Sequence, residues 1–297
     1  MTLDLTLGIV TLLVAVAIGV ISATVGVGGG FIMVPYMVII FAYPTKLAVG
    51  TSNLVIVFSA LSGSIAYFRQ RRIDYKVGVL AASLSVPGGI IGAYLTNFVT
   101  SGELAVIFSI ALFFVGLRMI IFPRERTKDI GPRDRKEGPV GEYQKKNRNA
   151  PTDKPRYVWK REIVDAAGHR FSYESSVLRA LPFYFFAGVL SGLLGIGGGV
   201  VIVPTLEILA SFPMHLAVAT SMFTMIFTSI STATTQLLLG HVVFDYVIFL
   251  IIGIVVGAQV GARVAKRLRG SAVERLFGVT MILIGIYLVI WEGILGL

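Results

Sequence analysis

Two glycine-rich stretches, each ending in a proline, interrupt the apolar sequence. The first reads GVGGGFIMVP from Gly26, and the second reads GIGGGVVIVP from Gly195, 169 positions later. Glycine destabilises a helix by up to about 1 kcal/mol per residue, and unwound backbone inside a bilayer is tolerated only against protein or a water-filled cavity. Free N–H groups at such a break, beside a helix N-terminus, form an anion site. The expected donors are Gly28, Gly29, Gly30, Gly197, Gly198 and Gly199.

One alternative interpretation of the glycines stays open, in which they only let helices pack closely. The prolines at Pro35 and Pro204 suit the first turn of a new helix, because proline needs no backbone donor there. A dinucleotide fingerprint does not fit, since Phe31 and Val200 occupy the place of its last glycine and no βαβ unit is predicted. No cofactor is therefore expected.

Hydroxyl and amide side chains follow both glycine stretches at the same spacing. AVGTSN ends in Thr51, Ser52 and Asn53, and AVATSM contains Thr220 and Ser221. Such groups can donate to an oxyanion without the desolvation cost of a buried charge. The alternative is that the hydroxyls bond to carbonyls of their own helix. We expect these residues to complete the anion site.

Few ionisable residues lie within the apolar runs. Glu207 is the clearest, with no acidic counterpart at Val38, and His215 stands at the start of a later run, as Lys46 does in the first half. An intramembrane carboxylate is a candidate for proton coupling. Coupling to protons or sodium through Glu207 or His215 is a hypothesis, and a position at an interfacial helix end is the alternative for Glu207.

The composition is that of an integral membrane protein. Of the 297 residues, 55% are hydrophobic and 14% charged, and the mean hydropathy is +0.83. The net charge of +10 indicates basic cytoplasmic loops rather than binding to nucleic acid. The chain has no cysteine, which excludes disulfides and thiolate metal sites, and no metal site is predicted.

Ten apolar segments must position these residues. They lie near 7–25, 31–43, 46–68, 76–96, 103–122, 180–196, 198–211, 215–239, 246–265 and 274–294. The second and seventh are too short to cross a bilayer of roughly 30 Å and are predicted as half-helices. Thr45 is expected to cap the helix that begins at Lys46. The fold class is an all-α polytopic membrane protein.

A polar insert divides the chain into three parts. Residues 1–122 and 180–297 are membrane repeats, and residues 123–179 contain 15 Lys or Arg and 9 Asp or Glu. The first part of this insert reads as a flexible linker. β-branched and aromatic residues on both sides of DAAG, at Asp165–Gly168, predict a small β-hairpin. A tether is favoured over a binding role for this hairpin.

The two membrane parts are predicted to be inverted repeats of five segments. KLAVGTSN at 46–53 recurs as HLAVATSM at 215–222. GGIIGA at 88–93 likewise recurs as GAQVGA at 257–262, again 169 positions later. Basic residues stay cytoplasmic, yet they occupy different loops in the two halves. They are Arg69, Arg71, Arg72 and Lys76 in the first half, and Arg263, Lys266, Arg267, Arg269 and Arg275 in the second. The insert is then cytoplasmic and both termini lie outside. The GxxxG ladder at 253, 257 and 261 predicts tight packing, within the protomer or in a homodimer.

With both glycine–proline motifs and both TS motifs in inverted halves, the chain resembles the TauE/SafE family, also called the toluene-sulfonate uptake permease family. The resemblance implies transport of small sulfur-containing anions such as sulfite, thiosulfate or organosulfonates. It carries over to residues 26–30 and 195–199 and to the TS pairs, whereas Ala219 and Met222 depart from Gly50 and Asn53.

The expected function is therefore a secondary transporter in the cell (inner) membrane that works by alternating access. A passive anion channel, or a membrane scaffold acting through the soluble insert, is the alternative. An enzyme is set aside, because no pair of intramembrane carboxylates, no HExxH and no serine–histidine pairing stands out.

Overall fold

The structure is a computed structural model that describes residues 4–100, 159–175 and 177–265, with single residues between 103 and 117 and between 279 and 283. Helices make up nearly all of it, which confirms the all-α membrane fold. The helices are α1 (Leu5–Val25), α2 (Gly30–Phe41), α3 (Thr45–Arg69), α4 (Tyr75–Leu95), α7 (Val177–Leu194), α8 (Gly199–Pro204), the π-helix η2 (Thr205–Leu209), α9 (Met214–Leu238) and α10 (Val247–Ala265). The segments predicted at 103–122 and 274–294 lie largely outside the described residues.

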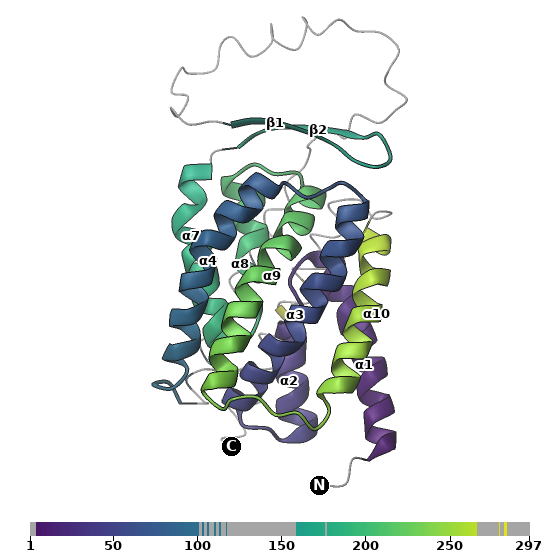
Figure 1. The fold of residues 1–297 in the computed structure, drawn as a ribbon, viewed down its shortest axis with the longest axis vertical. Coiled ribbons are helices and arrows are strands. Elements are labelled where there is room, and N and C mark those ends of the chain that lie inside the picture. Colours follow the sequence, from purple (N-terminus) through teal and green to yellow (C-terminus); the bar gives the residue numbers. More distant parts are fainter. Residues whose placement is uncertain are drawn as a thin grey trace, which may run out of the picture.

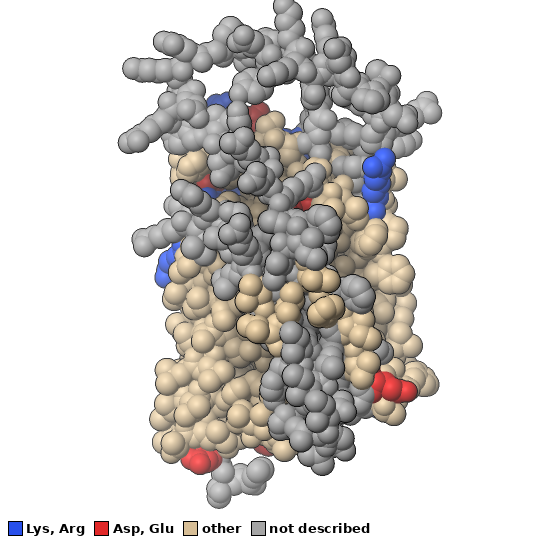
Figure 2. Space-filling view, turned by 180° about the vertical axis from the view of Figure 1, so that it is seen from behind, with Lys and Arg blue, Asp and Glu red and all other residues tan. Residues whose placement is uncertain are grey.

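Five of the described helices, α1, α3, α4, α9 and α10, are long and apolar enough to cross a membrane. On the face shown in Figure 2, the described surface has a broad band without charge. On this face Lys and Arg appear toward the hairpin end, and Asp and Glu appear toward both ends. An uncharged band between charged ends is the distribution expected of a chain that lies across a bilayer.

The two short segments begin earlier than their prolines indicate. Gly29 and Gly198 are the N-caps of α2 and α8, so each helix starts on the last glycine of its run. The prediction that Pro35 and Pro204 occupy the first turn is therefore wrong: Pro35 lies inside α2, and Pro204 ends α8. Because a proline cannot donate to the carbonyl four residues earlier, the helix loosens there, and a π-helical turn follows Pro204.

The start of α3 also differs from the prediction. α3 begins at Thr45, and its N-cap is Pro44, with no side-chain hydrogen bond at the cap. Thr45 therefore does not cap the helix.

Glycines bring the outer helices into backbone contact in two pairs. A Cβ added at Gly257 of α10 would meet the carbonyl oxygen of Val16 in α1, and one added at Gly92 of α4 would meet that of Val189 in α7. Gly253 and Gly261 contact α1 in the same way. The GxxxG ladder thus packs within the protomer, and the homodimer remains a prediction.

Helices at matching positions of the two halves run in opposite directions (Figure 1). α3 runs toward the hairpin end and α9 away from it, while α4 runs away from it and α10 toward it. α1 begins at the end opposite the hairpin, and α7 begins beside the hairpin.

A two-stranded antiparallel hairpin lies across one end of the helices (Figure 1). Its strands are β1 (Trp159–Val164) and β2 (Arg170–Ser175), on either side of the expected turn. Phe171 and Tyr173 are buried and pack with residues of α4, α7 and the start of α9. The Tyr173 ring lies 4.5 Å from that of Phe212. The hairpin expected on both sides of DAAG is therefore present, and it is packed onto the helices.

Candidate functional site

The two glycine stretches form loops that cross at the centre of the molecule. Gly28 and Gly29 have φ of 87° and 92°, and Gly197 and Gly198 have φ of 76° and 78°, a left-handed conformation that favours glycine. The backbones also touch. A Cβ at Gly30 would meet the carbonyl oxygen of Gly195, and one at Gly199 would meet that of Gly26. Any larger residue would push the two loops apart.

One pair of side chains fills the space against both loops. A Cβ at Gly28 would lie 3.1 Å from both Ile56 Cγ2 and Met225 Sδ, and one at Gly197 would lie 2.9 Å and 3.2 Å from the same two atoms. Ile56 and Met225 are fully buried. The loops from the two halves thus meet on the facing sides of α3 and α9.

The loops contain backbone donors that have no acceptor. The N–H groups of Gly26 and Gly195 bond to the carbonyls that end the preceding helices. Those of Gly28, Gly29, Gly197 and Gly198 donate to no group within the described part of the chain, and all four glycines are buried. Because a buried N–H is normally paired, this arrangement favours an anionic ligand or water at the crossing.

The serine hydroxyls of the TS motifs donate to backbone carbonyls of the opposite half and not to their own helix. Ser52 Oγ donates to the carbonyl of Gly195 at 2.8 Å, and Ser221 Oγ donates to that of Gly26 at 2.9 Å. Each serine therefore holds the glycine loop of the other half in place. Both expectations for these two residues miss this contact, because neither considered a partner from the opposite half.

The threonines of the TS motifs connect to loops at the two ends of the molecule. Thr220 Oγ1 accepts from the N–H of Asp74 at 3.1 Å, in the loop between α3 and α4. Thr51 Oγ1 accepts from the N–H of Val243 at 3.0 Å, in the loop between α9 and α10. An accepting hydroxyl keeps its own hydrogen to donate. Each threonine thus ties its half to a loop of the other.

Asn53 is a polar residue of α3 whose side-chain hydrogen-bonding capacity is unused among the described residues. It is fully buried, and neither its Nδ2 nor its Oδ1 has a partner among the described residues. It lies on α3 between Ser52, which bonds to the Gly195 carbonyl, and Ile56, which packs against both loops. Met222 stands at the matching place of α9. A buried amide without partners is rare enough to require an explanation, and a bound solute is one.

The two candidate coupling residues lie away from the crossing. Glu207 is 4% exposed and sits in the π-helix η2, eight residues beyond Gly199. His215 is the second residue of α9, half-buried, five residues before Thr220. The start of α9, which contains His215, lies at the hairpin end (Figure 1).

A buried ionic cluster joins the hairpin to the helices, and sequence reasoning missed it. Arg161 Nε lies 2.9 Å from Asp74 Oδ2, and Tyr173 Oη donates to the same oxygen at 2.6 Å. Arg72 Nη2 lies 2.9 Å from Asp165 Oδ2. The two partners Arg161 and Asp74 lie 87 positions apart, so no local sequence pattern indicates the pair.

Burial and pairing oppose each other at these carboxyls. Burial by itself raises the pKa of Asp74, but the bonds from Arg161, Tyr173 and the N–H of Val77 outweigh it, so the pKa lies below the usual 3.8. Burial likewise raises the pKa of Asp165, but the Arg72 guanidinium and two backbone N–H groups outweigh this effect. The pKa of Asp165 therefore also lies below 3.8. Both groups are therefore ionised at neutral pH.

The opposite end has no such cluster among the described residues. His241 Nδ1 lies 2.7 Å from Gln236 Oε1, and Tyr43 Oη donates to Asp245 at 3.3 Å. Burial and the charge of Lys46 lower the pKa of His241 below 6.5. Burial and Asp245 raise the pKa of Tyr43 to about 12. Both rings are thus neutral at pH 7.

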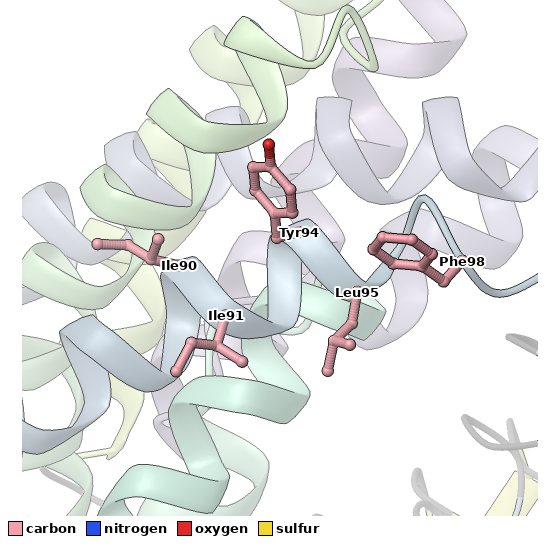
Figure 3. Close-up of a pocket in the computed structure, with 5 residues that line it drawn as sticks. All are labelled: Ile90, Ile91, Tyr94, Leu95 and Phe98. Atoms are coloured by element: carbon pink, nitrogen blue, oxygen red, sulfur yellow. The ribbon is translucent and has the colours of Figure 1, made fainter.

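A surface hollow on α4 is a poor candidate for the solute site. It is lined by Ile90, Ile91, Tyr94, Leu95 and Phe98 (Figure 3). All five side chains are exposed on the outer face of the helices. None is a donor except the Tyr94 hydroxyl, so the hollow suits apolar contact with lipid.

Comparison with known proteins gives one family and several relatives. A family model described as "Sulfite exporter TauE/SafE" matches residues 11–288. The chain is 29% identical to a probable membrane transporter protein, YunE of Bacillus subtilis (strain 168), over 283 residues, which cover 93% of this chain and 94% of the relative. It is 25% identical to the probable membrane transporter protein MJ0441 of Methanocaldococcus jannaschii over 216 residues, 71% of this chain and 65% of the relative. No solved structure matches.

Proposed function

Because the chain belongs to the sulfite exporter TauE/SafE family of membrane transporters, we propose that it is a secondary transporter. It carries small sulfur-containing anions, such as sulfite, thiosulfate or organosulfonates, by alternating access. The observation that supports this proposal best is the crossing of two glycine loops whose buried N–H groups at Gly28, Gly29, Gly197 and Gly198 have no acceptor among the described residues.

The donor set suits a tetrahedral oxyanion. A sulfonate or sulfite presents three oxygens as acceptors, and the crossing offers the buried backbone N–H groups of both loops, with the Nδ2 of Asn53 on α3 as a further candidate donor. These donors carry no formal charge, so an anion bound by them can also leave. A fixed cation in the same place would hold it more tightly.

Contacts that recur in pairs support the inverted repeat. The bonds of Ser52 and Thr51 to the second half are matched by the bonds of Ser221 and Thr220 to the first, and every residue in these bonds lies 169 positions from its counterpart. The hydrogen bond from Tyr67 Oη to the Ala23 carbonyl is likewise matched by the hydrogen bond from Gln236 Nε2 to the Gly192 carbonyl. Matched contacts between oppositely directed halves are what a two-fold axis in the membrane plane would produce.

The described arrangement corresponds to an occluded carrier. Residues of the crossing are buried, with a loop at each end closed over one of the two threonines. A site buried from both sides favours a carrier over a continuous pore. In alternating access the Thr220–Asp74 bond breaks when the hairpin end opens, and the Thr51–Val243 bond breaks when the opposite end opens.

Orientation and coupling complete the proposal. The basic hairpin end faces the cytoplasm of a cell whose inner membrane holds the protein, and the termini lie outside. Protons or sodium couple the movement, with Glu207 or His215 as the residues to test. Flux that ignores both gradients would favour the passive channel.

A binding screen on purified protein tests the proposal. Sulfite, thiosulfate, sulfate and an alkyl sulfonate are titrated against thermal unfolding, because a ligand that binds the folded state raises the unfolding temperature with concentration. We expect one of the sulfur anions to stabilise the protein and chloride at the same ionic strength to have no effect. If no sulfur anion differs from chloride, this function is wrong.

A further inference from the structure

The two ends of the molecule are closed by equivalent bonds but reinforced unequally. At each end a backbone N–H of a loop donates to a TS threonine of the other half, from Asp74 to Thr220 and from Val243 to Thr51. Among the described elements, only at the hairpin end does a further element lie across the ends of the helices (Figure 1). That element is the hairpin, residues 159–175.

Asp74 links the hairpin to the site threonine. Its N–H bonds to Thr220, while its carboxylate accepts from Arg161 and Tyr173 of the hairpin and also caps the first turn of α4. The side chain of Asp74 is fully buried and that of Arg161 is 22% exposed. One residue thus connects the solute site, α4 and the hairpin.

A second attachment lies at the hairpin turn. Arg72 forms a buried ion pair with Asp165, and the N–H of Ala166 donates to the carbonyl of Gln70 at 2.9 Å. Asp165 also accepts from the backbone of the turn at Ala167 and His169, so the turn is shaped around the carboxylate that holds Arg72. Both attachments are to the loop between α3 and α4, in the first half.

The hairpin also contacts the second half, in addition to its contacts with the loop at 70–74 and with α4. It continues directly into α7, and the Tyr173 ring packs on Phe212, just before α9. The contacts of Arg161 and Asp165 therefore span from one half to the other. Opening at this end separates Asp74 from Thr220, so the halves must also part at the hairpin's ion pairs.

We propose that the hairpin is a latch, which holds the hairpin end closed through the Asp74–Arg161–Tyr173 and Arg72–Asp165 contacts. Opening toward this end requires the hairpin to release the loop at 70–74. The inference rests on the proposed alternating access and adds an element that regulates opening at the hairpin end. Breaking one partner of a buried ion pair leaves the other charge uncompensated, so loss of Arg161 shifts the protein toward the state open at this end.

Cysteine labelling tests the latch without any solute. The chain has no cysteine, so Ala217→Cys places a single thiol one turn from Thr220 on the hairpin side, at a buried position. An impermeant maleimide is added to vesicles that expose the hairpin end. We expect Arg161→Ala to raise the labelling rate by about tenfold or more. Tyr173→Phe, a milder change that removes only a hydroxyl, is expected to raise it less.

Arg170→Ala is the matched control. Arg170 lies on the same hairpin and pairs at 3.5 Å with Glu162, but both side chains are largely exposed and the pair does not touch the loop at 70–74. Labelling in this variant should equal that of the parent. Equal rates in Arg161→Ala and the parent overturn the latch. So does an equal rise in Arg161→Ala and Arg170→Ala, because that rise would reflect general loosening of the hairpin.

A cross-link provides the converse test. Gln70→Cys with Ala166→Cys places thiols on the two residues joined by the backbone bond. The oxidised protein should lose thiosulfate or sulfite flux and Ala217→Cys labelling, and a reductant should restore both. Undiminished labelling after oxidation overturns the latch. If the transport proposal alone fails, flux is absent throughout while the labelling differences remain.

Discussion

Asn53 breaks the chemical symmetry of the proposed solute site, because Met222 occupies the matching position. A buried amide without partners costs free energy in the empty protein, and a solute that accepts from Nδ2 would recover it. The two positions therefore separate a role in binding from a role in packing.

Asn53→Leu should weaken binding of the stabilising anion by about 1 to 3 kcal/mol, roughly 5- to 150-fold in affinity. The unfolding temperature of the empty protein should stay the same or rise, because an unpaired polar group is removed. Met222→Leu is the control and should leave affinity unchanged. Unaltered affinity in Asn53→Leu would exclude the amide from the site.

Ser52 and Ser221 should behave as a structural pair. Ser52→Ala leaves the Gly195 carbonyl without its donor, and Ser221→Ala does the same to Gly26. Each is expected to lower the free energy of unfolding by about 1 to 3 kcal/mol, by similar amounts. Thermal unfolding without any anion measures this effect. A large loss in one variant and none in the other would contradict the matched geometry.

Residue types were predictable from the sequence, but residue partners were not. The glycines and the TS pairs stand out by recurrence. The acceptor of Ser52, however, lies 143 positions away and that of Ser221 lies 195 away. Recurrence shows that two positions are equivalent and says nothing of which half each faces. The site residues could therefore be named, while the cross-half bonds needed coordinates.

At the scale of elements, the helices were predictable because long apolar runs have few alternatives in a membrane. The prolines misled, since Pro35 and Pro204 look like first-turn residues, whereas the left-handed N-caps Gly29 and Gly198 already start each helix. The hairpin strands followed from their β-branched and aromatic residues. Its docking did not, because it depends on distant charges.

The glycine contacts between α1 and α10 can be tested with one methyl group. A Cβ at Gly257 would meet the Val16 carbonyl, a backbone atom that can move only with its helix. Gly257→Ala should therefore lower the free energy of unfolding by about 1 to 3 kcal/mol, despite the better helix propensity of alanine. Ile252→Ala, on the exposed face of α10, should be nearly neutral in the same thermal measurement.

At the scale of the whole molecule, the two ends should respond to acid differently. Asp74 and Asp165 have lowered pKa values, so the stability that they give to the docked hairpin is present above pH 3.8 and is lost only as the pH falls further. His241, at the other end, also has a lowered pKa. In the closed form His241 binds a proton less readily than it does when this end is open. The closed form of this end therefore becomes less stable relative to the open form as the pH falls below 6.5.

Limited proteolysis of the hairpin and cysteine labelling beside Val243 can follow the two ends. Between pH 8 and pH 5 the hairpin should stay equally protected, while labelling at the His241 end should rise. His241→Gln, which keeps a hydrogen-bonding group but cannot be protonated, should abolish that rise. Loss of hairpin protection above pH 5 would contradict the assigned ion pairs.

Removal of the hairpin distinguishes a transporter from a scaffold. Replacing residues 140–175 with a short flexible linker leaves both membrane parts joined. We expect anion flux to persist, since the glycine loops and the TS residues lie outside the deleted segment. Absence of flux, in a variant that still binds the anion and unfolds cooperatively, would favour a role centred on the insert.

Within the described part of the chain a hairpin lies at one end alone, and this asymmetry has a kinetic consequence. No such asymmetry can move the equilibrium distribution of a solute, because detailed balance ties the rate constants around the transport cycle together. It can, however, make the resting protein open more often to one compartment, and the fraction of molecules that are ready to bind sets the apparent affinity. The half-saturating concentration should therefore be lower when the solute is offered from the side without the hairpin.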